Sequence, residues 1–541
     1  MTTSKANKFF LFFTLLLLLL SAAGSVITLP SRALEYDEIW TQQHYSKSSF
    51  HDVFTDVSTP NNHPLHTLLV QGAIKVFGMK YHALRTPAFA AGLLTVLLAL
   101  YAVYHTTRNM MLVLFATCWT AFHGYLIQYT MTARGYTLQC LFVLASCLAL
   151  LYLFQHPKSW KAAVLFAVTG IMTCLTVISG LIFPVAASGT FILFAILRKE
   201  WKKHLYAGLA IAAVMLFALL WYSSIYQEIR QAQQFGAYIT GVGDFFQFCG
   251  TTLWKLHLLI PLGICIVGVC IRKNPYRILS AAALVFTAAI LCSAIFTKAG
   301  PERVYLPTVT PVIVIAAISL AGMYSLLHLK PVYLLLFTAV LSIYPMTTFR
   351  NDIRTLSEPE WRWITKEIFA DLPASSLPIY GPSESFSVLY NVDTASGEQD
   401  KRIRSGLSSL FLVNRSEALL TVTNQAVNNN TLDLRKFQHQ KVTLQFNDTP
   451  CIFLPLAPLT EKTDLRDRPL IYTVALFRDG TASNRIVDLQ KNDPFCMMNL
   501  FFNNLRNCDA YIIEKPSQPN TYYLNITGDS QGTIRFYTPI K

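Results

Sequence analysis

Long apolar runs recur along the first two thirds of this chain, and they constrain its fold more than any other feature. Each run is close to the roughly 20 residues that an α-helix needs to cross about 30 Å of hydrocarbon. Composition agrees, because 53% of the 541 residues are hydrophobic and only 14% are charged, against about 25% in soluble domains. We therefore expect a polytopic α-helical membrane protein, and not a soluble, disordered or coiled-coil one.

About eleven spans are predicted. The first apolar run begins at Phe9, and we expect it to be a retained helix; a cleaved signal peptide, with small residues at 21–24, is the alternative. The other ten spans are predicted roughly at 84–104, 110–129, 136–154, 162–178, 181–197, 205–222, 253–271, 278–296, 304–327 and 332–347.

The net charge of +14 would suit nucleic-acid binding only if the basic residues were clustered on one surface. Here many of them fall in every second loop between the predicted spans. Such loops face the cytoplasm. With a cytoplasmic N-terminus, the cytoplasmic cations are Arg108, Lys158, Lys161, Arg198, Lys199, Lys202, Lys203, Arg272, Lys273, Arg277 and Lys330. An odd number of spans then places the chain after about residue 349 on the opposite side of the membrane.

Two domains follow from this topology: a membrane domain at 1–349, with a first extracytoplasmic loop at 30–82, and an extracytoplasmic α/β domain at 350–541. In the second, alternating or apolar segments predict strands, and amphipathic segments predict helices. The strands are expected at 377–380, 471–477, 511–514 and 533–537, and the helices at 359–369 and 384–390. Cys496 and Cys508 could form a disulfide or remain free thiols.

An acidic pair, Asp37 and Glu38, follows the first span directly in Leu-Glu-Tyr-Asp-Glu-Ile-Trp. Beside a membrane, a carboxylate can accept a proton from a nucleophile, or hold a divalent cation against a phosphate. The alternative is that both residues simply stabilise the start of a juxtamembrane helix.

Polar and basic residues occur at three further points on the same predicted face. Arginine suits bidentate contact with phosphate, although an interfacial arginine can also merely snorkel. His63 could orient an acid, contact a phosphate, bind metal or be inert. The candidates for donor-phosphate or substrate binding are Asn62, His63, Arg134, Tyr136, Lys298, Arg303 and Tyr305.

In their order and sidedness, these motifs resemble those of the GT-C glycosyltransferases of the protein O-mannosyltransferase and lipid A aminoarabinose transferase type, particularly bacterial family 39-like members. The matching stretches are 36–40, 62–65, 77–78 with 84–87, 133–136 and 303–307. The resemblance covers about residues 1–350. The Trp-Trp-Asp motif of oligosaccharyltransferases is absent, which argues against transfer of a whole glycan.

The resemblance implies an inverting transferase that uses a polyprenyl-phosphate monosaccharide donor and a glycolipid, glycan or protein acceptor. It implies that Asp37 is the base and Glu38 its partner, with both as ligands if a divalent metal takes part. It also implies that Arg134, Arg303 and Tyr305 contact the donor phosphate. His63 stands where several relatives of the aminoarabinose type carry a lysine, which puts its phosphate role in doubt.

Three other functions remain open from the sequence. The first is a surface polysaccharide polymerase or ligase that uses a lipid-linked glycan. The second is a transporter or flippase, which would predict ionisable residues near the membrane midplane. The third is a receptor-like protein. For the transferase we expect a bacterial inner membrane, with the C-terminal domain in the periplasm.

Overall fold

A computed structural model describes residues 3–28, 37–38, 41, 45, 48–57, 62–78, 81–232, 239, 241–296, 300–328 and 330–357, together with ten strands between residues 379 and 536. The chain divides into two compact units. The helical unit comprises Met1–Arg32 and Trp40–Ser357, and the strand unit comprises Ala33–Ile39 and Glu358–Lys541.

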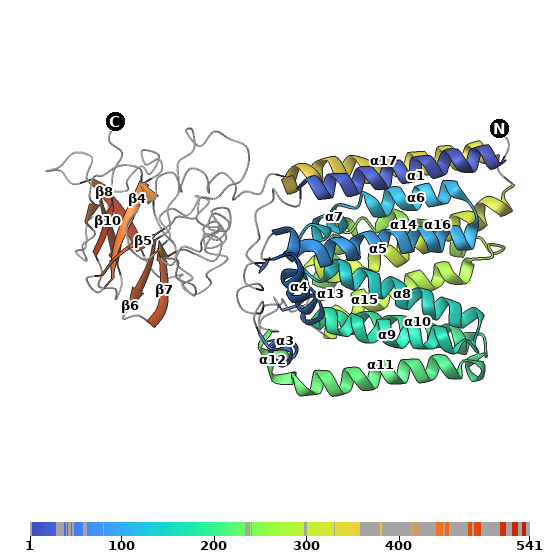
Figure 1. The fold of residues 1–541 in the computed structure, drawn as a ribbon, viewed down its shortest axis with the longest axis horizontal. Coiled ribbons are helices and arrows are strands. Elements are labelled where there is room, and N and C mark those ends of the chain that lie inside the picture. The colour runs from blue at the N-terminus through green and yellow to red at the C-terminus, as the bar shows by residue number, and fades with distance from the viewer. Residues whose placement is uncertain are drawn as a thin grey trace. The chain divides into compact units, whose positions relative to one another are not determined.

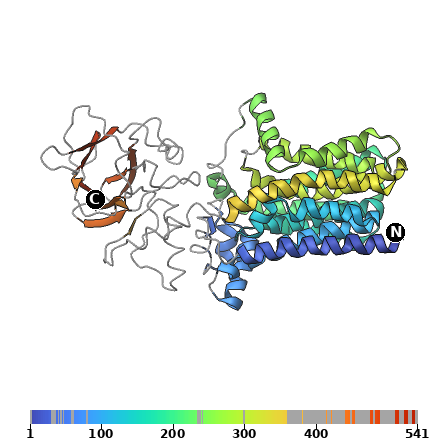
Figure 2. The same cartoon turned by 90° about the horizontal axis from the view of Figure 1, so that it is seen from above.

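The long helices of the helical unit run side by side in a bundle (Figures 1 and 2). The α-helices are α1 (Thr3–Thr28), α3 (Phe50–Thr55), α4 (Pro64–Phe77), α5 (Tyr81–Thr107), α6 (Met110–Ala121), α7 (Gly124–Thr130), α8 (Tyr136–Gln155), α9 (Trp160–Thr176), α10 (Ile182–Leu197), α11 (Leu205–Ser224), α12 (Tyr226–Ala232), α13 (Val242–Lys255), α14 (Leu259–Cys270), α15 (Arg277–Phe296), α16 (Val309–Leu326) and α17 (Pro331–Ser357). Short 3-10 turns are η1 (Ile178–Leu181), η2 (Trp201–Lys203) and η4 (Glu302–Thr308).

Seven helices of the described part are long and apolar enough to cross a membrane, and the number rises to nine if each of two bent pairs is one span. The seven are α5, α8, η1 with α10, α11, α15, η4 with α16, and α17. Shorter apolar helices occur at Phe9–Ala23 and Trp160–Thr176. The chain is a multi-pass membrane protein, and the total of eleven spans stays a prediction.

Helix α16 is the centre of the bundle, since 83% of its span window with η4 is buried inside the protein. It packs against α5, α6, α8, α14 and α15. Helix α11 instead packs mainly on α9 and exposes apolar residues such as Leu209 and Leu219. An apolar outer face of this kind suits contact with lipid.

Helix α1 packs on α6. The Ser21 hydroxyl donates a hydrogen bond of 2.7 Å to the carbonyl oxygen of Ala121, at the end of α6. The side chains of Phe10 and Leu18 pack on the main core. These contacts make α1 part of the bundle.

Two predicted segments, 110–129 and 253–271, are broken where we expected continuous helices. Helices α6 and α7 meet at a 61° bend, and α13 and α14 meet at a 102° bend. The two breaks contact each other, because His123 Nε2 lies 3.0 Å from the Leu256 carbonyl oxygen. At the second break His257 has a φ of 53°, which ends a right-handed helix. Apolar composition did not reveal these breaks, because the contact that joins them is between residues 133 positions apart.

The strand unit contains a six-stranded sheet and two two-stranded sheets. Its strands are β1 (Ile379–Tyr380), β2 (Val413–Asn414), β3 (Leu420–Thr421), β4 (Gln440–Phe446), β5 (Thr449–Phe453), β6 (Val474–Arg478), β7 (Thr481–Val487), β8 (Asp509–Glu514), β9 (Tyr522–Thr527) and β10 (Thr533–Phe536). The main sheet has the order β1-β5-β4-β10-β3, with β2 also paired to β4, and only β1–β5 is parallel. The pairs β6–β7 and β8–β9 are antiparallel.

Strands β1, β6, β8 and β10 overlap the four segments predicted to be strands. The predicted helices at 359–369 and 384–390 lie outside the described residues, as do Cys496 and Cys508. The α/β class of this domain and its boundary at residue 349 therefore stay predictions.

Candidate functional site

Asn62 fixes the chain at the start of α4, and both polar atoms of its buried side-chain amide form hydrogen bonds within the protein. The side-chain nitrogen donates hydrogen bonds of 2.8 Å to the carbonyl oxygens of Val53 and Asp56. The side-chain oxygen accepts a bond of 3.2 Å from the Thr67 hydroxyl. Asn62 therefore holds the loop and positions the next residue, His63.

His63 is tied directly to the turn before α8. Its Nδ1 accepts a hydrogen bond of 2.7 Å from the backbone N–H of Gly135. A Cβ at position 135 would lie 2.9 Å from this Nδ1 and 3.1 Å from the carbonyl oxygen of Thr176. Glycine is needed here for the close approach, and an accepting Nδ1 leaves the ring proton on Nε2.

The His63 ring is neutral, because three positive or partly positive neighbours add to the effect of its burial. Burial lowers the pKa of His63 well below its usual value, and Arg134, His66 and Arg303 lower it further. The ring is 1% exposed. Within the part of the chain that the structure describes, Nε2 has no hydrogen-bond partner. His63 thus offers one buried, uncharged N–H donor.

Tyr136, at the start of α8, brings the separate motifs together. Its ring packs edge-on against His63 at 4.9 Å and against Tyr129 at 4.7 Å between centroids. The Arg134 guanidinium carbon lies 5.8 Å from the Tyr136 ring centroid, and Arg303 Nε donates a 3.2 Å hydrogen bond to the Tyr136 hydroxyl. We call His63, Arg134, Tyr136 and Arg303 the donor cluster.

Helix η4 is fixed beside this cluster by contacts to α13. The buried Tyr305 ring packs against Phe248 with 5.3 Å between centroids. Next to Arg303, Glu302 forms an ion pair with Lys255. These contacts hold the backbone on both sides of Arg303, and the Tyr305 ring contacts α13.

Three predicted site residues are not part of the donor cluster: Asp37, Glu38 and Lys298. Asp37 and Glu38 are helical and belong to the strand unit. Asp37 is half-buried, and Glu38 is 1% exposed. Lys298 lies outside the described residues. The catalytic roles of Asp37 and Glu38 and the phosphate role of Lys298 stay predictions.

His, Cys, Asp and Glu side chains are the usual protein ligands of a divalent ion. Among the described residues, no three His, Cys, Asp or Glu side chains gather where they could hold an ion. Asp37 and Glu38 are two carboxylates, fewer than Ca²⁺ or Zn²⁺ usually takes from a protein. The divalent ion stays a prediction.

Two contacts that shape the site were not singled out from the sequence. One is the Gly135 N–H bond to His63, whose only signal was a glycine directly before a predicted helix in Ala-Arg-Gly-Tyr. The other is the pair of Lys255 with Glu302, 47 positions apart in sequence. Neither pairing can be read from local spacing, because each joins elements distant along the chain.

Several solved structures align with this chain at low sequence identity. ArnT from Cupriavidus metallidurans, solved in the apo state and bound to undecaprenyl phosphate, aligns at 14% identity over 71% of this chain and 69% of its own, with a TM-score of 0.45. An oligosaccharyltransferase from Archaeoglobus fulgidus, in complex with Zn and sulfate, aligns at 13% identity over 66% and 55%, with a TM-score of 0.40. The arabinosyltransferase EmbB from Mycobacterium smegmatis aligns at 11% identity over 96% and 62%, with a TM-score of 0.38.

No protein-family model matches the sequence. No curated protein matches it either. The similarities to solved structures concern the backbone. Any chemistry must be argued from the residues of this chain.

Gly135→Ala should destabilise the protein, because the added methyl group would push against the His63 ring and the Thr176 carbonyl. The expected cost is about 1–3 kcal/mol, as for other overpacked sites. The melting temperature of the detergent-purified chain, followed by tryptophan fluorescence, measures it. Gly208→Ala is the matched control, since nothing lies within 4 Å of a Cβ there. Equal melting temperatures for the two variants would contradict the close approach.

Acidification should destabilise the wild type more than His63→Gln. Folding lowers the pKa of His63, so the unfolded chain takes up this proton first as the pH falls below about 6.5. The stabilisation is therefore complete above that pH and is lost as the pH falls. Melting temperatures of both proteins between about pH 7.5 and 5 give the comparison. Parallel curves would show that His63 does not titrate in this way.

Proposed function

We propose that this protein is a membrane glycosyltransferase that moves a monosaccharide from a polyprenyl phosphate to a glycolipid, glycan or protein acceptor. The observation that carries the proposal is the donor cluster. Two guanidinium groups and one neutral imidazole N–H gather around Tyr136, although their motifs are far apart in sequence. We propose that the reaction takes place at the extracytoplasmic ends of the spans.

The donor cluster suits a departing phosphate. When the bond from the sugar C1 to the phosphate oxygen breaks, the electron pair stays on that oxygen and its negative charge grows. Arg134 and Arg303 would stabilise this charge through charge-assisted hydrogen bonds in a largely buried place. The Nε2–H of His63 would add a third donor without a third charge, which limits repulsion among the cations.

The acceptor requires a base, and we assign this role to Asp37. Its carboxylate would take the proton of the acceptor hydroxyl while the acceptor oxygen forms the new bond to C1. Attack on the face opposite the phosphate inverts the anomeric centre. Glu38 is proposed as the partner that keeps Asp37 correctly placed, and no step in this scheme passes through a metal.

The remaining candidates support the cluster. Asn62 would act as a positioning residue, because its amide is used entirely within the protein. Tyr136 would hold Arg303 through its hydroxyl group. Tyr305 and Lys298 are proposed to contact the donor from the segment around η4. The location proposed for this reaction is a bacterial inner membrane, with the C-terminal domain in the periplasm.

The first test is release of polyprenyl phosphate from a panel of polyprenyl-phosphate sugars, using membranes that contain the full chain. Wild type should turn over one sugar of the panel. Asp37→Asn should reduce the rate by about two to four orders of magnitude, the range for a general base. Asp244→Asn, which removes an exposed carboxylate at the start of α13, should retain the wild-type rate.

Turnover that is equal in wild type and Asp37→Asn would remove Asp37 as the base and leave the transferase in place. No turnover of any donor, with all proteins inserted and folded, would contradict the use of monosaccharide donors and favour a lipid-linked glycan or transport. A parallel series with a chelator tests the predicted divalent ion. If the chelator stops turnover and added Mg²⁺ or Mn²⁺ restores it, a divalent ion takes part in the reaction.

The role of His63 as an uncharged donor predicts different effects for two substitutions. His63→Phe removes the N–H and should lower kcat/KM about tenfold or more, which corresponds to about 1.4 kcal/mol. His63→Gln keeps an amide N–H and should lose less. His105→Phe is the matched control, because His105 is exposed at the far end of α5. Equal loss in both His63 variants would contradict the hydrogen-bonding role.

A further inference from the structure

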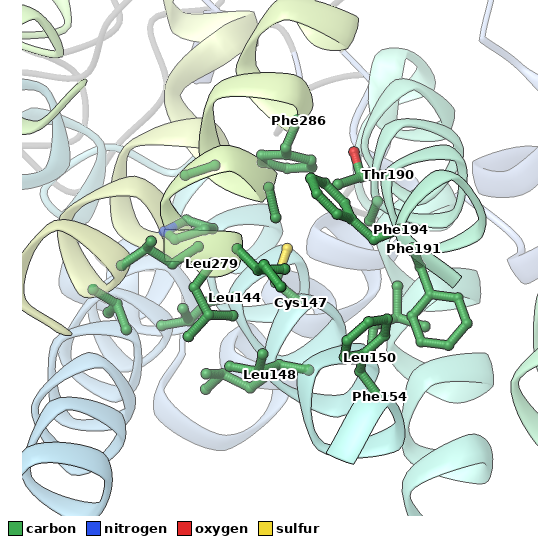
Figure 3. Close-up of a pocket in the computed structure, with 18 residues that line it drawn as sticks. Leu144, Cys147, Leu148, Leu150, Phe154, Thr190, Phe191, Phe194, Leu279 and Phe286 are labelled. Carbon is green, nitrogen blue, oxygen red and sulfur yellow. The ribbon is translucent and has the colours of Figure 1, made fainter. Parts of the chain in front are cut away.

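A second candidate site lies in the half of the bundle away from the donor cluster. Helices α8, α10, α15 and α16 enclose a cavity of about 110 Å³ (Figure 3). Its walls include Leu144, Leu150, Phe191 and Phe286. It extends along α8 as far as Phe154, in the last turn of that helix. Positive loop charges predict that this end of the bundle faces the cytoplasm.

The cavity wall is almost entirely hydrocarbon. Its hydroxyl group, on Thr190, donates a 2.8 Å hydrogen bond to the carbonyl oxygen of Ala186 within the same helix. The other non-hydrocarbon side chain is the Cys147 thiol, which is a weak donor. A polar ligand would therefore lose its hydrogen bonds to water without replacement, whereas an alkyl chain would lose none.

One side of the cavity reaches the surface of the bundle. Leu148, Phe194 and Leu279 are half-exposed, while Leu144 and Phe286 are buried. The exposed surface of apolar spanning helices faces lipid. A hydrocarbon chain can thus enter sideways from the bilayer without crossing water.

Two arginines lie next to residues that line the cavity, one in contact with Phe154 and one directly before Ile278. The guanidinium carbon of Arg198, just after α10, lies 5.3 Å from the centroid of the Phe154 ring. Arg277 begins α15 directly before Ile278, another lining residue, and its Nε donates a 2.9 Å bond to the Val269 carbonyl oxygen. Both arginines are exposed, and neither forms an ion pair with a residue that the structure describes.

Nearby acidic charge does not neutralise these arginines. Glu200 follows α10 by three residues, and its carboxylate oxygen accepts a 3.2 Å contact from the Lys203 ammonium group. Arg198 therefore places a positive charge beside the lining residue Phe154, and Arg277 adds a second charge at the start of α15, next to the lining residue Ile278. A guanidinium group binds phosphate oxygens in a bidentate way, and basic sites between cytoplasmic helix ends suit anionic lipid head groups.

We propose that this cavity is a binding site for an anionic phospholipid, with one acyl chain inside and the phosphate on Arg198 and Arg277. The site is distinct from the donor cluster and does not depend on the proposed reaction. Its ligand is a structural or regulatory lipid of the cytoplasmic leaflet. Charge at the mouth sets the choice of head group, and the apolar wall sets the affinity for the chain.

The test measures lipid retention by native mass spectrometry on the full detergent-purified chain. Phosphatidylglycerol and phosphatidylcholine with identical acyl chains are the two probes. Wild type should retain phosphatidylglycerol in preference. Arg198→Gln with Arg277→Gln should weaken this binding about 25-fold, because each cation near an anionic lipid contributes about fivefold. Arg198→Gln alone should lose about fivefold, and it leaves the Arg277 bond to Val269 intact.

The variant with Arg108→Gln and Lys330→Gln is the control for general attraction between anionic lipid and cytoplasmic cations, because it removes the same charge from other loops. This pair should keep the wild-type preference. Ala282→Trp fills the cavity from a half-exposed lining position and should reduce retention of both lipids. Ala213→Trp, on the exposed face of α11, should not.

Three results would overturn the proposal. The first is equal loss of phosphatidylglycerol in the Arg108 with Lys330 variant, which would reduce the effect to general charge. The second is unchanged retention in Ala282→Trp. The third is displacement of phosphatidylglycerol by an equimolar polyprenyl phosphate, which would make the cavity a site for the donor chain instead. Monodispersity and melting temperature of each variant show that it is folded.

Discussion

A hydrocarbon interior offers no water to backbone N–H and C=O groups, and this constraint governs where polar chemistry can occur in the chain. Along the spans, several hydroxyl groups are satisfied inside their own helices: Thr117, Thr169, Thr190 and Thr287 donate to carbonyl oxygens four residues earlier. Groups that could act on a ligand gather at the ends of helices instead. The donor cluster and the arginines beside the apolar cavity are both such places.

At the donor cluster, burial and positive charge act in the same direction on His63. Protonation would add a third charge beside Arg134 and Arg303, so the ring stays neutral and its pKa is lowered. The Gly135 N–H occupies Nδ1 and leaves Nε2 as the donor. One backbone hydrogen bond therefore sets the position, the tautomer and the hydrogen-bonding capacity of this side chain.

The membrane character of the fold could be predicted from apolar run length, because that length must match the bilayer. The predicted segments at 84–104, 136–154 and 205–222 correspond to α5, α8 and α11. The bends in 110–129 and 253–271 could not be predicted in this way. They depend on contacts between the two breaks, including the His123 ring and the Leu256 carbonyl, which lie 133 positions apart.

The sequence by itself determined that this is a polytopic membrane protein and which polar motifs stand at the ends of its spans, because hydropathy and charge act locally along a chain. It identified His63, Arg134, Tyr136 and Arg303 as candidates. Only the tertiary structure decided that the other three meet around Tyr136 and that the Asn62 amide is hydrogen-bonded within the protein. Hydrogen bonds and ring contacts between distant helices set such geometry, and their partners leave no local signal.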